Sequence, residues 1–238
     1  RSLIATADVV QGNLPHTGSR PSRVVVWDAA TCTPVSSAYT GLSVGSGLRA
    51  LDISKDNKLL VALYADAANT VTIYDVASMN VLHTYSYGAD AALRDVKFSG
   101  TSTVYITAGA KGVQFGINEG TVFVPEGGDL HYEAREGLLQ GAPVDGVEAT
   151  AICKFELPDE CVTATSSGHV LFWRGRSCIQ CIKAHNSAVS CLSYSAETRL
   201  VASTGLDGSV KTFKVLGGAA ATATVSKSGP KLLKVRQL

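Results

Sequence analysis

Two overlapping glycine-rich runs have residue types that could support catalysis or nucleotide binding. Residues 41–45 read GLSVG and match the G-x-S-x-G pattern, in which a strand–turn–helix exposes a nucleophilic serine. Residues 45–50 imitate a dinucleotide-binding fingerprint, which also needs a following helix to present its N-terminus to phosphates. The apolar pattern of residues 48–53 predicts a strand there. We therefore interpret both runs as one loop.

A second set of residues could ligate zinc. Cys178 and Cys181 are followed by His185 and Cys191, and thiolate and imidazole are the ligands that zinc prefers. Two side chains three residues apart on a strand point to opposite faces, which is wrong for joint chelation. We therefore expect ordinary thiols, no metal and no cofactor. The six cysteines have irregular spacing, which favours reduced thiols in the cytosol over a disulfide framework.

A third set pairs a histidine with an Asp-Gly turn. His185 precedes a strand-like segment, and Asp207 lies in the turn before another. A carboxylate can accept a hydrogen bond from an imidazole, and the Ser203 hydroxyl can bind the other ring nitrogen. Phe213 would pack beside them. The usual residue there is tryptophan, whose N–H joins the network, so phenylalanine removes one link. This pattern predicts a structural polar network.

The strands that would carry these residues recur along the chain. Apolar segments of similar pattern occupy residues 48–54, 93–99, 150–155 and 189–194. A second series of segments ends in the aromatic residues Trp27, Tyr74, Phe115, Trp173 and Phe213. These aromatics are 47, 41, 58 and 40 residues apart, close to the roughly 40–45 residues of a WD-type propeller blade. No sustained helical pattern interrupts the series, so the sequence predicts an all-β fold, a WD40-type β-propeller of about five blades.

The remaining segments complete one partial propeller over residues 1–238. Residues 2–7 read as the second strand of the first blade, so that blade is expected to lack its inner strand. The long aromatic interval predicts an insertion over residues 116–147, with an outer strand at residues 121–124 and a mildly acidic loop. Residues 217–229 are rich in Gly, Ala, Ser and Thr, and predict a flexible loop. Residues 231–235 are a candidate for the last outer strand.

Composition limits the function classes. The 238 residues are 45% hydrophobic and 17% charged, with a net charge of +1, as in a soluble globular protein. This balance predicts that the protein binds neither nucleic acid nor membranes. The chain begins at Arg1 and is expected to be part of a longer protein. Beyond Asp207 every charged residue is basic, and a possible basic contact surface, alternatively a solvated strand, comprises Lys227, Lys231, Lys234 and Arg236.

Several motifs together resemble one family. They are LIAT at residues 3–6, RVVVWD at 23–28, GSGLRALDIS at 45–54, AGAKGVQF at 108–115 and IKAH at 182–185. With the glycine-containing loop between the first two, they are similar to the WD-repeat region of echinoderm microtubule-associated protein-like proteins over most of residues 2–215. Two positions depart from that family. Gly116 replaces an aromatic residue, and Ser167 replaces the turn aspartate, so only the last blade is expected to form the full network.

The resemblance implies a propeller of seven blades, of which this chain supplies about five. It further implies a non-catalytic interaction module that binds tubulin, microtubules or axonemal proteins in the cytoskeleton, including cilia or flagella. Five blades of a seven-blade ring leave strand edges unpaired. An interface built from a ring should fail when the ring is incomplete, so we expect this stretch alone to bind microtubules weakly or not at all. One alternative is a generic WD40 scaffold in another complex. The other is an enzyme with a site in the propeller channel, which the inner-strand residues Leu51, Val96, Cys153 and Leu192 disfavour because few acids or histidines accompany them.

Overall fold

The computed structural model describes residues 2–7, 23–39, 47–100, 102–118, 132–139, 147–155, 159–216 and 231–237. For residues 231–237 the description covers the backbone. Within these ranges the chain forms strands and one 3-10 helix, η1, of three residues (Ala89–Ala91). No helix in this part of the chain has the length or apolar content to span a membrane.

The strands group into five antiparallel sheets, here called blades 1 to 5. Blade 1 contains β1 (Leu3–Ala7), β2 (Arg23–Asp28) and β3 (Pro34–Tyr39). Blade 2 contains β4 (Leu48–Ile53), β5 (Leu59–Tyr64), β6 (Thr70–Asp75) and β7 (Val81–Ser86). Blade 3 contains β8 (Asp95–Phe98), β9 (Val104–Gly109), β10 (Gly112–Asn118) and β11 (Tyr132–Glu136). Blade 4 contains β12 (Ala149–Lys154), β13 (Glu160–Thr165), β14 (His169–Arg174) and β15 (Ser177–Lys183). Blade 5 contains β16 (Val189–Ser195), β17 (Leu200–Gly205), β18 (Val210–Leu216) and β19 (Lys231–Gln237).

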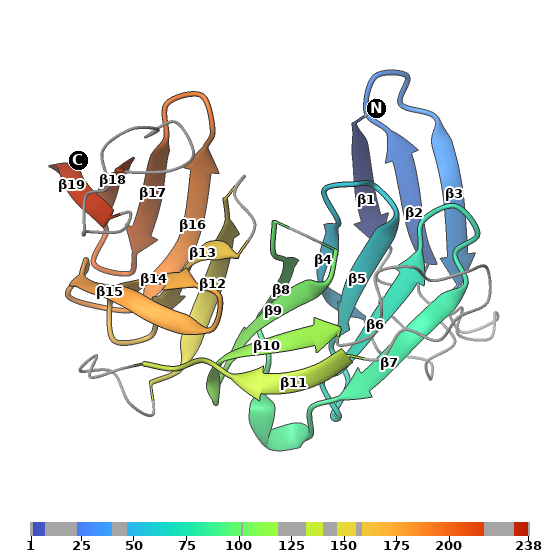
Figure 1. Ribbon diagram of the computed structural model, residues 1–238, viewed down its shortest axis with the longest axis horizontal. Coiled ribbons are helices and arrows are strands. Elements are labelled where there is room, and N and C mark those ends of the chain that lie inside the picture. Colours follow the sequence, from blue (N-terminus) through green and yellow to red (C-terminus); the bar gives the residue numbers. More distant parts are fainter. Residues whose placement is uncertain are drawn as a thin grey trace, which may run out of the picture.

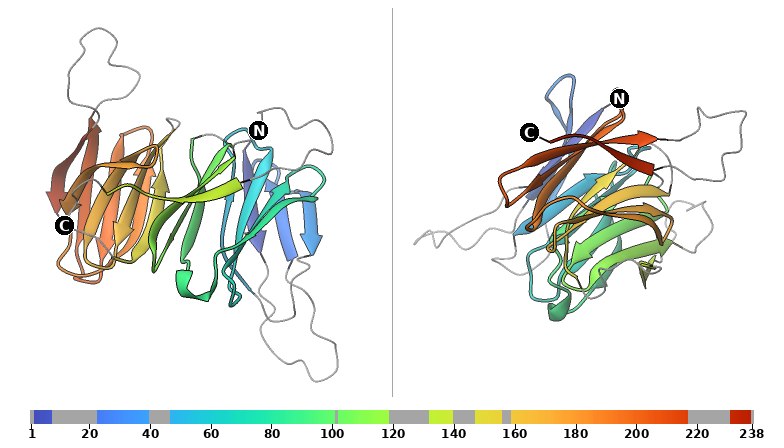
Figure 2. Two further views of the ribbon diagram at one scale, coloured as in Figure 1. Left: turned by 60° about the horizontal axis from the view of Figure 1, so that its bottom comes forward. Right: turned by 90° about the vertical axis from the view of Figure 1, so that its left-hand side faces the viewer.

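The blades follow one another along an arc in sequence order, with blade 1 and blade 5 at its two ends (Figure 1). The inner strands β4, β8, β12 and β16 contact each other in that order, and β1 contacts β4. Seen from a second direction, the sheets pack face to face, one beside the next (Figure 2). Blade 1 has three strands where the others have four, because the described chain begins with the second strand of that blade.

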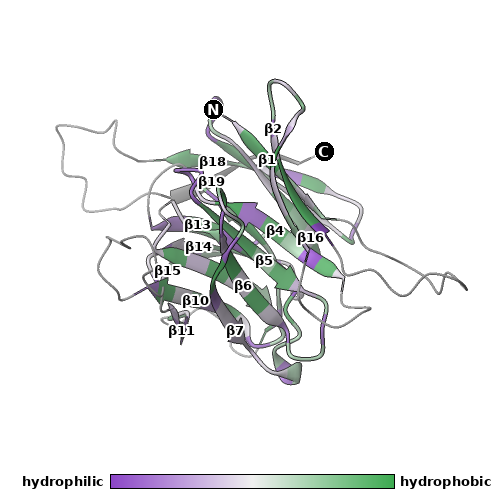
Figure 3. Cartoon of the chain, turned by 90° about the vertical axis from the view of Figure 1, so that its right-hand side faces the viewer, coloured by the Kyte–Doolittle hydropathy of each residue, from purple (hydrophilic) through white to green (hydrophobic). Residues whose placement is uncertain are grey.

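The core lies between the blades. Successive residues of a strand point to opposite faces of its sheet, so a strand with neighbours on both sides is apolar along its whole length. In β5 every residue after the first is buried, and the hydrophobic colouring extends along this strand (Figure 3). Each pair of neighbouring blades shares one hydrophobic cluster. Representative members are Val26 and Leu60 for blades 1 and 2, Val61 and Phe98 for blades 2 and 3, Ile106 and Leu171 for blades 3 and 4, and Phe172 and Val201 for blades 4 and 5.

The segment predicted as an insertion contributes to blade 3. Residues 116–118 complete β10, and the outer strand of the blade is β11 at Tyr132–Glu136. The outer strand predicted at residues 121–124 lies outside the described residues, as does the loop predicted at 217–229. The strand predicted at residues 231–235 is present as β19, which pairs with β18.

Gly116 makes room for the outer packing of blade 3. A Cβ atom at this position would overlap the ring of Tyr105. Tyr105 is fully buried and packs against Tyr132 of β11, with ring centroids 5.2 Å apart. The aromatic group that the family resemblance places at position 116 is therefore supplied from the two neighbouring strands.

Candidate functional site

The turn between β17 and β18 fixes the position of the Asp207 carboxylate. Gly208 adopts a positive φ of 77°, which favours glycine because a side chain there is strained. One carboxylate oxygen, Oδ1, accepts hydrogen bonds from the Ser209 backbone N–H (3.1 Å) and hydroxyl (2.7 Å). The other, Oδ2, accepts one from the Asn186 N–H (2.9 Å). The turn therefore holds the carboxylate beside the loop that enters blade 5.

His185 occupies this turn with both ring nitrogens bonded. Its Nδ1 lies 3.1 Å from Asp207 Oδ1 and 3.0 Å from Ser209 Oγ, and its Nε2 lies 2.8 Å from Ser203 Oγ. An imidazole that carries its proton on Nδ1 donates to the carboxylate and accepts from Ser203. The structure thus brings His185, Ser203 and Asp207 together. Ser209 joins them, and its position two residues after Asp207 was the signal in the sequence.

The hydrogen bonds to Asp207 stabilise its ionised form. The Asn186 N–H contributes most, followed by the Ser209 hydroxyl, and together they lower the pKa of the Asp207 carboxyl well below its usual range. An ionised carboxylate is the form that accepts a hydrogen bond from the imidazole. The network, here called the turn network, consists of His185, Ser203, Asp207 and Ser209.

Two glycines allow the close approach on which the turn network depends. A Cβ atom on Gly205 would overlap the His185 ring, and one on Gly168 would overlap the His185 carbonyl oxygen. Gly168 also accepts hydrogen bonds at its own carbonyl from the N–H groups of Ala184 (3.0 Å) and His185 (2.9 Å). The β13–β14 turn of blade 4 therefore supports the loop that carries His185.

The blade aromatics are buried in their blades, with one exception at the N-terminal end. Phe213 is fully buried in the cluster between blades 4 and 5. In blade 4 the Trp173 indole N–H donates to Thr163 Oγ1 (2.8 Å). The Trp27 indole donates likewise to Thr6 Oγ1 (2.7 Å), although Trp27 is only half-buried. Phe213 lies at the position of Trp173 and has no such donor.

The other two predicted aromatics pack differently. The Tyr74 hydroxyl forms a buried hydrogen bond with that of Tyr64. Phe115 packs edge-on against Trp173, with ring centroids 5.7 Å apart. These aromatics therefore join neighbouring strands or blades.

The corresponding turn of blade 4 replaces the aspartate with a serine. Ser167 Oγ lies 2.9 Å from Nδ1 of His169, and Thr165 Oγ1 accepts the His169 N–H at 2.9 Å. This turn is closed by local side chains and holds no imidazole from the preceding loop within the described residues. Blade 4 therefore lacks the carboxylate-centred network of blade 5.

Cys178 and Cys181 lie on the same face of β15, which corrects the expectation from spacing. A β-bulge between Phe172 and Trp173 shifts the register, so Cys178 pairs with Trp173 and Cys181 with Leu171. Trp173 and Leu171 share a face, so their partners do as well. Burial raises the pKa of the Cys178 thiol to about 11, and no group of three metal-ligating side chains occurs in the described part of the chain.

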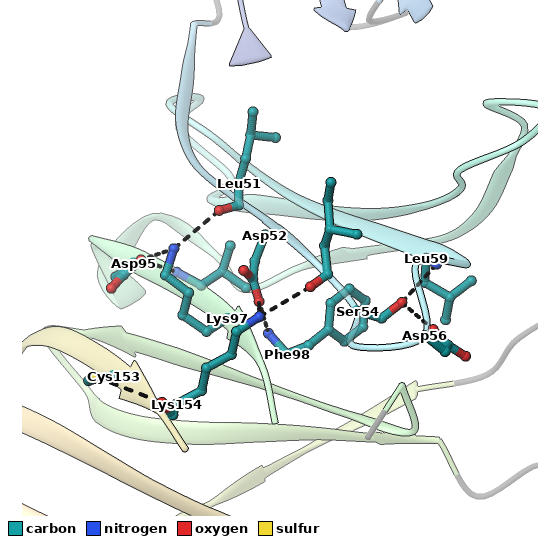
Figure 4. Close-up of polar contacts among 12 residues, drawn as sticks. Leu51, Asp52, Ser54, Asp56, Leu59, Asp95, Lys97, Phe98, Cys153 and Lys154 are labelled. Atoms are coloured by element: carbon teal, nitrogen blue, oxygen red, sulfur yellow. Dashed lines mark hydrogen bonds and ion pairs between the residues drawn. The ribbon is translucent and has the colours of Figure 1, made fainter. Parts of the chain in front are cut away.

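A second polar group lies on the inner strands, and sequence reasoning missed it. Asp52 on β4 accepts a hydrogen bond at Oδ2 from Lys154 Nζ on β12 (2.7 Å) and another from the Phe98 N–H on β8 (2.9 Å) (Figure 4). Lys154 also donates to the Ile53 carbonyl (3.1 Å), and Lys97 donates to the Leu51 carbonyl (3.2 Å). These contacts bridge blades 2, 3 and 4.

Asp95 continues the same pattern one blade further. Its Oδ2 accepts the Ile152 N–H of β12 (3.0 Å), and its Oδ1 accepts the Val96 N–H (2.9 Å). Burial is the main effect and raises the pKa of the Asp95 carboxyl, whereas Lys97, 3.9 Å away, opposes that rise. Asp52, Asp95, Lys97 and Lys154 are here called the inner-strand cluster.

The inner-strand cluster was detectable from alternation. The inner-strand residues considered in the sequence analysis are apolar, and all four pack in or against the clusters between blades: Leu51, Val96, Cys153 and Leu192. The neighbouring residues point the other way and include Asp52, Lys97 and Lys154. The sequence argument against an enzyme noted few acidic residues, but it considered the apolar face of the inner strands, whereas their charged side chains lie on the opposite face.

The predicted basic surface lies largely beyond the described side chains. Lys231, Lys234 and Arg236 are placed on β19 by its backbone, and Lys227 lies outside the described residues.

Comparison with known proteins agrees with this geometry. Residues 176–214 match the family model of the WD domain, G-beta repeat. No curated protein matches the chain. The chain resembles the β-propeller domain of Myceliophteria thermophila Cps50 (Swd1), with a TM-score of 0.68 and 16% sequence identity. That match covers 90% of this chain and 65% of the other, so this chain spans less than two thirds of that propeller. At such identity the likeness shows the fold.

The fold is therefore an all-β, WD40-type β-propeller with five blades described. Propellers of this class are generally non-catalytic scaffolds for protein interactions.

Proposed function

We propose that this propeller is a non-catalytic interaction module that binds microtubules or other cytoskeletal or axonemal proteins in the cytoplasm. Two observations support it: the fold, and the motifs shared with echinoderm microtubule-associated protein-like proteins. Those motifs fall on structural elements, with LIAT in β1, RVVVWD forming β2 and LRALDI forming β4. The motifs therefore form strands of the scaffold, including β1 and β4, which contact each other between blades 1 and 2.

The observation that carries the non-catalytic part of the proposal is that the inner-strand cluster forms hydrogen bonds and ion pairs between blades. Asp52 and Asp95 accept backbone N–H groups from the next blade, and Lys154 neutralises Asp52. Charges that hold blades together are not available to activate a substrate. Binding then falls to loops and outer strands on a rigid frame, as is usual for such scaffolds.

The charge at the end of the chain also favours a microtubule as the partner. Every charged residue after Asp207 is basic, and these include Lys227, Lys231, Lys234 and Arg236. A microtubule has an acidic surface, and opposite charges accelerate encounter and fix orientation, with a strong dependence on salt.

Microtubule co-sedimentation of the 238-residue chain over a salt series tests the proposal. We expect weak pelleting that salt reduces and that replacing those four basic residues with serine abolishes. A matched control replaces four exposed lysines that precede Asp207, Lys55, Lys58, Lys111 and Lys183, with serine and should pellet as the parent does. If the parent stays in solution at every salt concentration, direct microtubule binding is wrong and a scaffold for other partners takes its place.

A further inference from the structure

The β13–β14 turn of blade 4 repeats the backbone of the turn that holds Asp207 in blade 5. Gly168 has a φ of 84° and Gly208 has a φ of 77°. The N–H of each glycine donates to the carbonyl three residues before it, at 3.1 Å in both turns. Ser167, directly before Gly168, therefore takes the place of Asp207.

Two side chains that can carry positive charge lie beside Ser167. Its Oγ is 2.9 Å from Nδ1 of His169. The ammonium of Lys183, at the end of β15, donates to the Ser167 carbonyl. Burial and, after it, the charge of Lys183 lower the pKa of His169, which shows that the ammonium and the imidazole are close together. A negative group at residue 167 would face both of them.

Neither side chain has an acidic partner in the described part of the chain. The ion pairs formed there involve other residues, and the Lys183 ammonium bonds one acceptor, the Ser167 carbonyl. In blade 5 the same turn surrounds the Asp207 carboxylate with hydrogen-bond donors. Blade 4 therefore has the donors of an anion-centred turn without the anion.

A phosphate ester on Ser167 has the charge and the acceptors that this turn lacks. A phosphoserine carries about −1.5 to −2 charges at neutral pH and has three acceptor oxygens. One ammonium and one imidazolium together balance that charge. Ser167 is half-buried and Lys183 is exposed, so the cations lie at the surface of the blade.

We propose that Ser167 is a phosphorylation site whose phosphate gives blade 4 the anion-centred turn that Asp207 gives blade 5. A protein kinase transfers the γ-phosphoryl group of ATP to the Ser167 hydroxyl. The bond from the γ-phosphorus to its bridging oxygen breaks, the Oγ–P bond forms, ADP leaves, and the hydroxyl proton passes to a base of the kinase. The phosphate oxygens then accept hydrogen bonds from Lys183 and from protonated His169.

The modification links blade 4 to the turn network of blade 5. Lys183 lies two residues before His185, in the segment that leads from β15 into that network. A phosphate that binds the Lys183 ammonium holds the start of this segment against the blade 4 turn. It also replaces a local excess of positive charge with a balanced or negative one, which alters the surface that a partner meets.

Phosphoserine incorporated at position 167 during synthesis of the 238-residue chain tests the geometry without a kinase. The new charge-assisted hydrogen bonds should raise the melting temperature by about 3 °C. The phosphate favours the imidazolium, so NMR titration should show the pKa of His169 higher than in the parent by about 1. In a Lys183→Met chain the phosphate should raise the melting temperature by less, because one of its two cations is lost.

Phosphoserine at position 78 is the matched control. Ser78 is exposed on the β6–β7 turn, and its hydroxyl donates to the Asp75 carboxylate (2.7 Å). A phosphate there meets a carboxylate in place of two cations, so it should lower the melting temperature and leave the pKa of His169 unchanged.

Access of a kinase is tested on the unmodified parent chain. Incubation with ATP and an extract of eukaryotic cells, followed by fragmentation mass spectrometry, should locate phosphate on Ser167. The Ser167→Ala chain should lose that signal. Phosphate on the adjacent Ser166 in place of Ser167 would contradict the assignment.

Three results would overturn the proposal. They are no phosphate on Ser167 in the extract, a melting temperature that phosphoserine at position 167 lowers as the control does, or an unchanged pKa of His169 in the phosphorylated chain. None of these assays contains microtubules, so their outcome is independent of the proposed cytoskeletal function.

Discussion

The turn network of blade 5 and the inner-strand cluster of blades 2 to 4 both surround aspartates with donors, but they do so in different surroundings. The turn network lies within one blade and encloses His185, which is 1% exposed. The inner-strand cluster joins three blades, and its Lys154 side chain is 35% exposed. Removing one partner of a buried hydrogen bond leaves the other without a partner or water, which lowers stability strongly. A partly exposed ion pair is screened by water and salt, so removing it lowers stability less. We therefore expect the turn network to govern stability and the cluster to align the blades.

The two regions also shift aspartate pKa values in opposite directions. Asp207 is surrounded by N–H and hydroxyl donors that favour its charge, so its pKa falls. Asp95 lies between blades with its side chain 19% exposed, and partial burial raises its pKa despite its two backbone donors. The same residue type therefore stabilises one region most when charged and carries a cost of burial in the other.

Replacing His185 with alanine should cause the largest loss. The change leaves the buried Ser203 hydroxyl without its partner and opens a cavity, which together should lower the free energy of unfolding by about 3 kcal/mol. Urea denaturation measures it. His169→Ala, in the half-buried turn of blade 4, is the control and should cost about 1 kcal/mol or less. Equal losses at the two positions would show that the turn network is not special.

Replacing Gly205 with alanine tests the network without removing any of its members. The added methyl group would overlap the His185 ring and should lower the free energy of unfolding by about 2 kcal/mol. Gly208→Asn is the matched control, because its site is open and asparagine tolerates positive φ. Thermal and urea unfolding of both variants would decide. A Gly205→Ala protein as stable as its parent would contradict the packing around His185.

Blade 5 lacks the indole hydrogen bond that blade 4 forms, and removing that bond from blade 4 measures what it contributes to stability. Trp173→Phe deletes the donor to Thr163 and should lower the free energy of unfolding by about 1.5 kcal/mol. A double-mutant cycle with Thr163→Val should give a coupling of about 1 kcal/mol. A coupling near zero would mean that blade 4 gains as little from this position as blade 5 does.

Replacing Lys154 with methionine should have a smaller effect that depends on salt. Asp52 keeps the Phe98 N–H, and the pair is partly exposed, so the loss should be about 1 kcal/mol at low salt and less at high salt. Lys58→Met, on the exposed β4–β5 turn, is the control and should show no such dependence. Denaturation at two salt concentrations measures both. A loss that salt leaves unchanged would indicate a packing effect instead.

The smallest effects are the opposite pH dependences of two asparagine variants. The folded pKa of Asp207 is depressed, so its contribution is present above the unfolded value of about 4 and is lost as the pH falls below it. The folded pKa of Asp95 is raised, so its contribution is present below about 4 and is lost as the pH rises through the folded pKa.

Melting temperatures of Asp207→Asn and Asp95→Asn relative to the parent, followed from neutral to acidic pH, test these signs. The deficit of Asp207→Asn should shrink on acidification, whereas Asp95→Asn should become relatively worse. Parallel curves for the two variants would contradict the assignment of donors to Asp207 and burial to Asp95.

The sequence determined the elements of this protein that depend on local pattern. Alternating apolar residues and aromatic spacing predicted the strands, the three-stranded first blade and the propeller fold. The His185, Ser203 and Asp207 positions followed from one repeat, because a turn and its flanking strands are close in sequence. The position of Ser209 was readable in the same way.

Tertiary structure alone decided how the blades meet. The bulge in blade 4 turned Cys178 and Cys181 to one face, which no spacing rule for a regular strand can give. Lys154 reaches Asp52 across 102 residues of sequence, so their contact depends on the curvature of the arc. Strand patterns specify which face is apolar, but the partner of each polar face is set by the packing of one blade on the next.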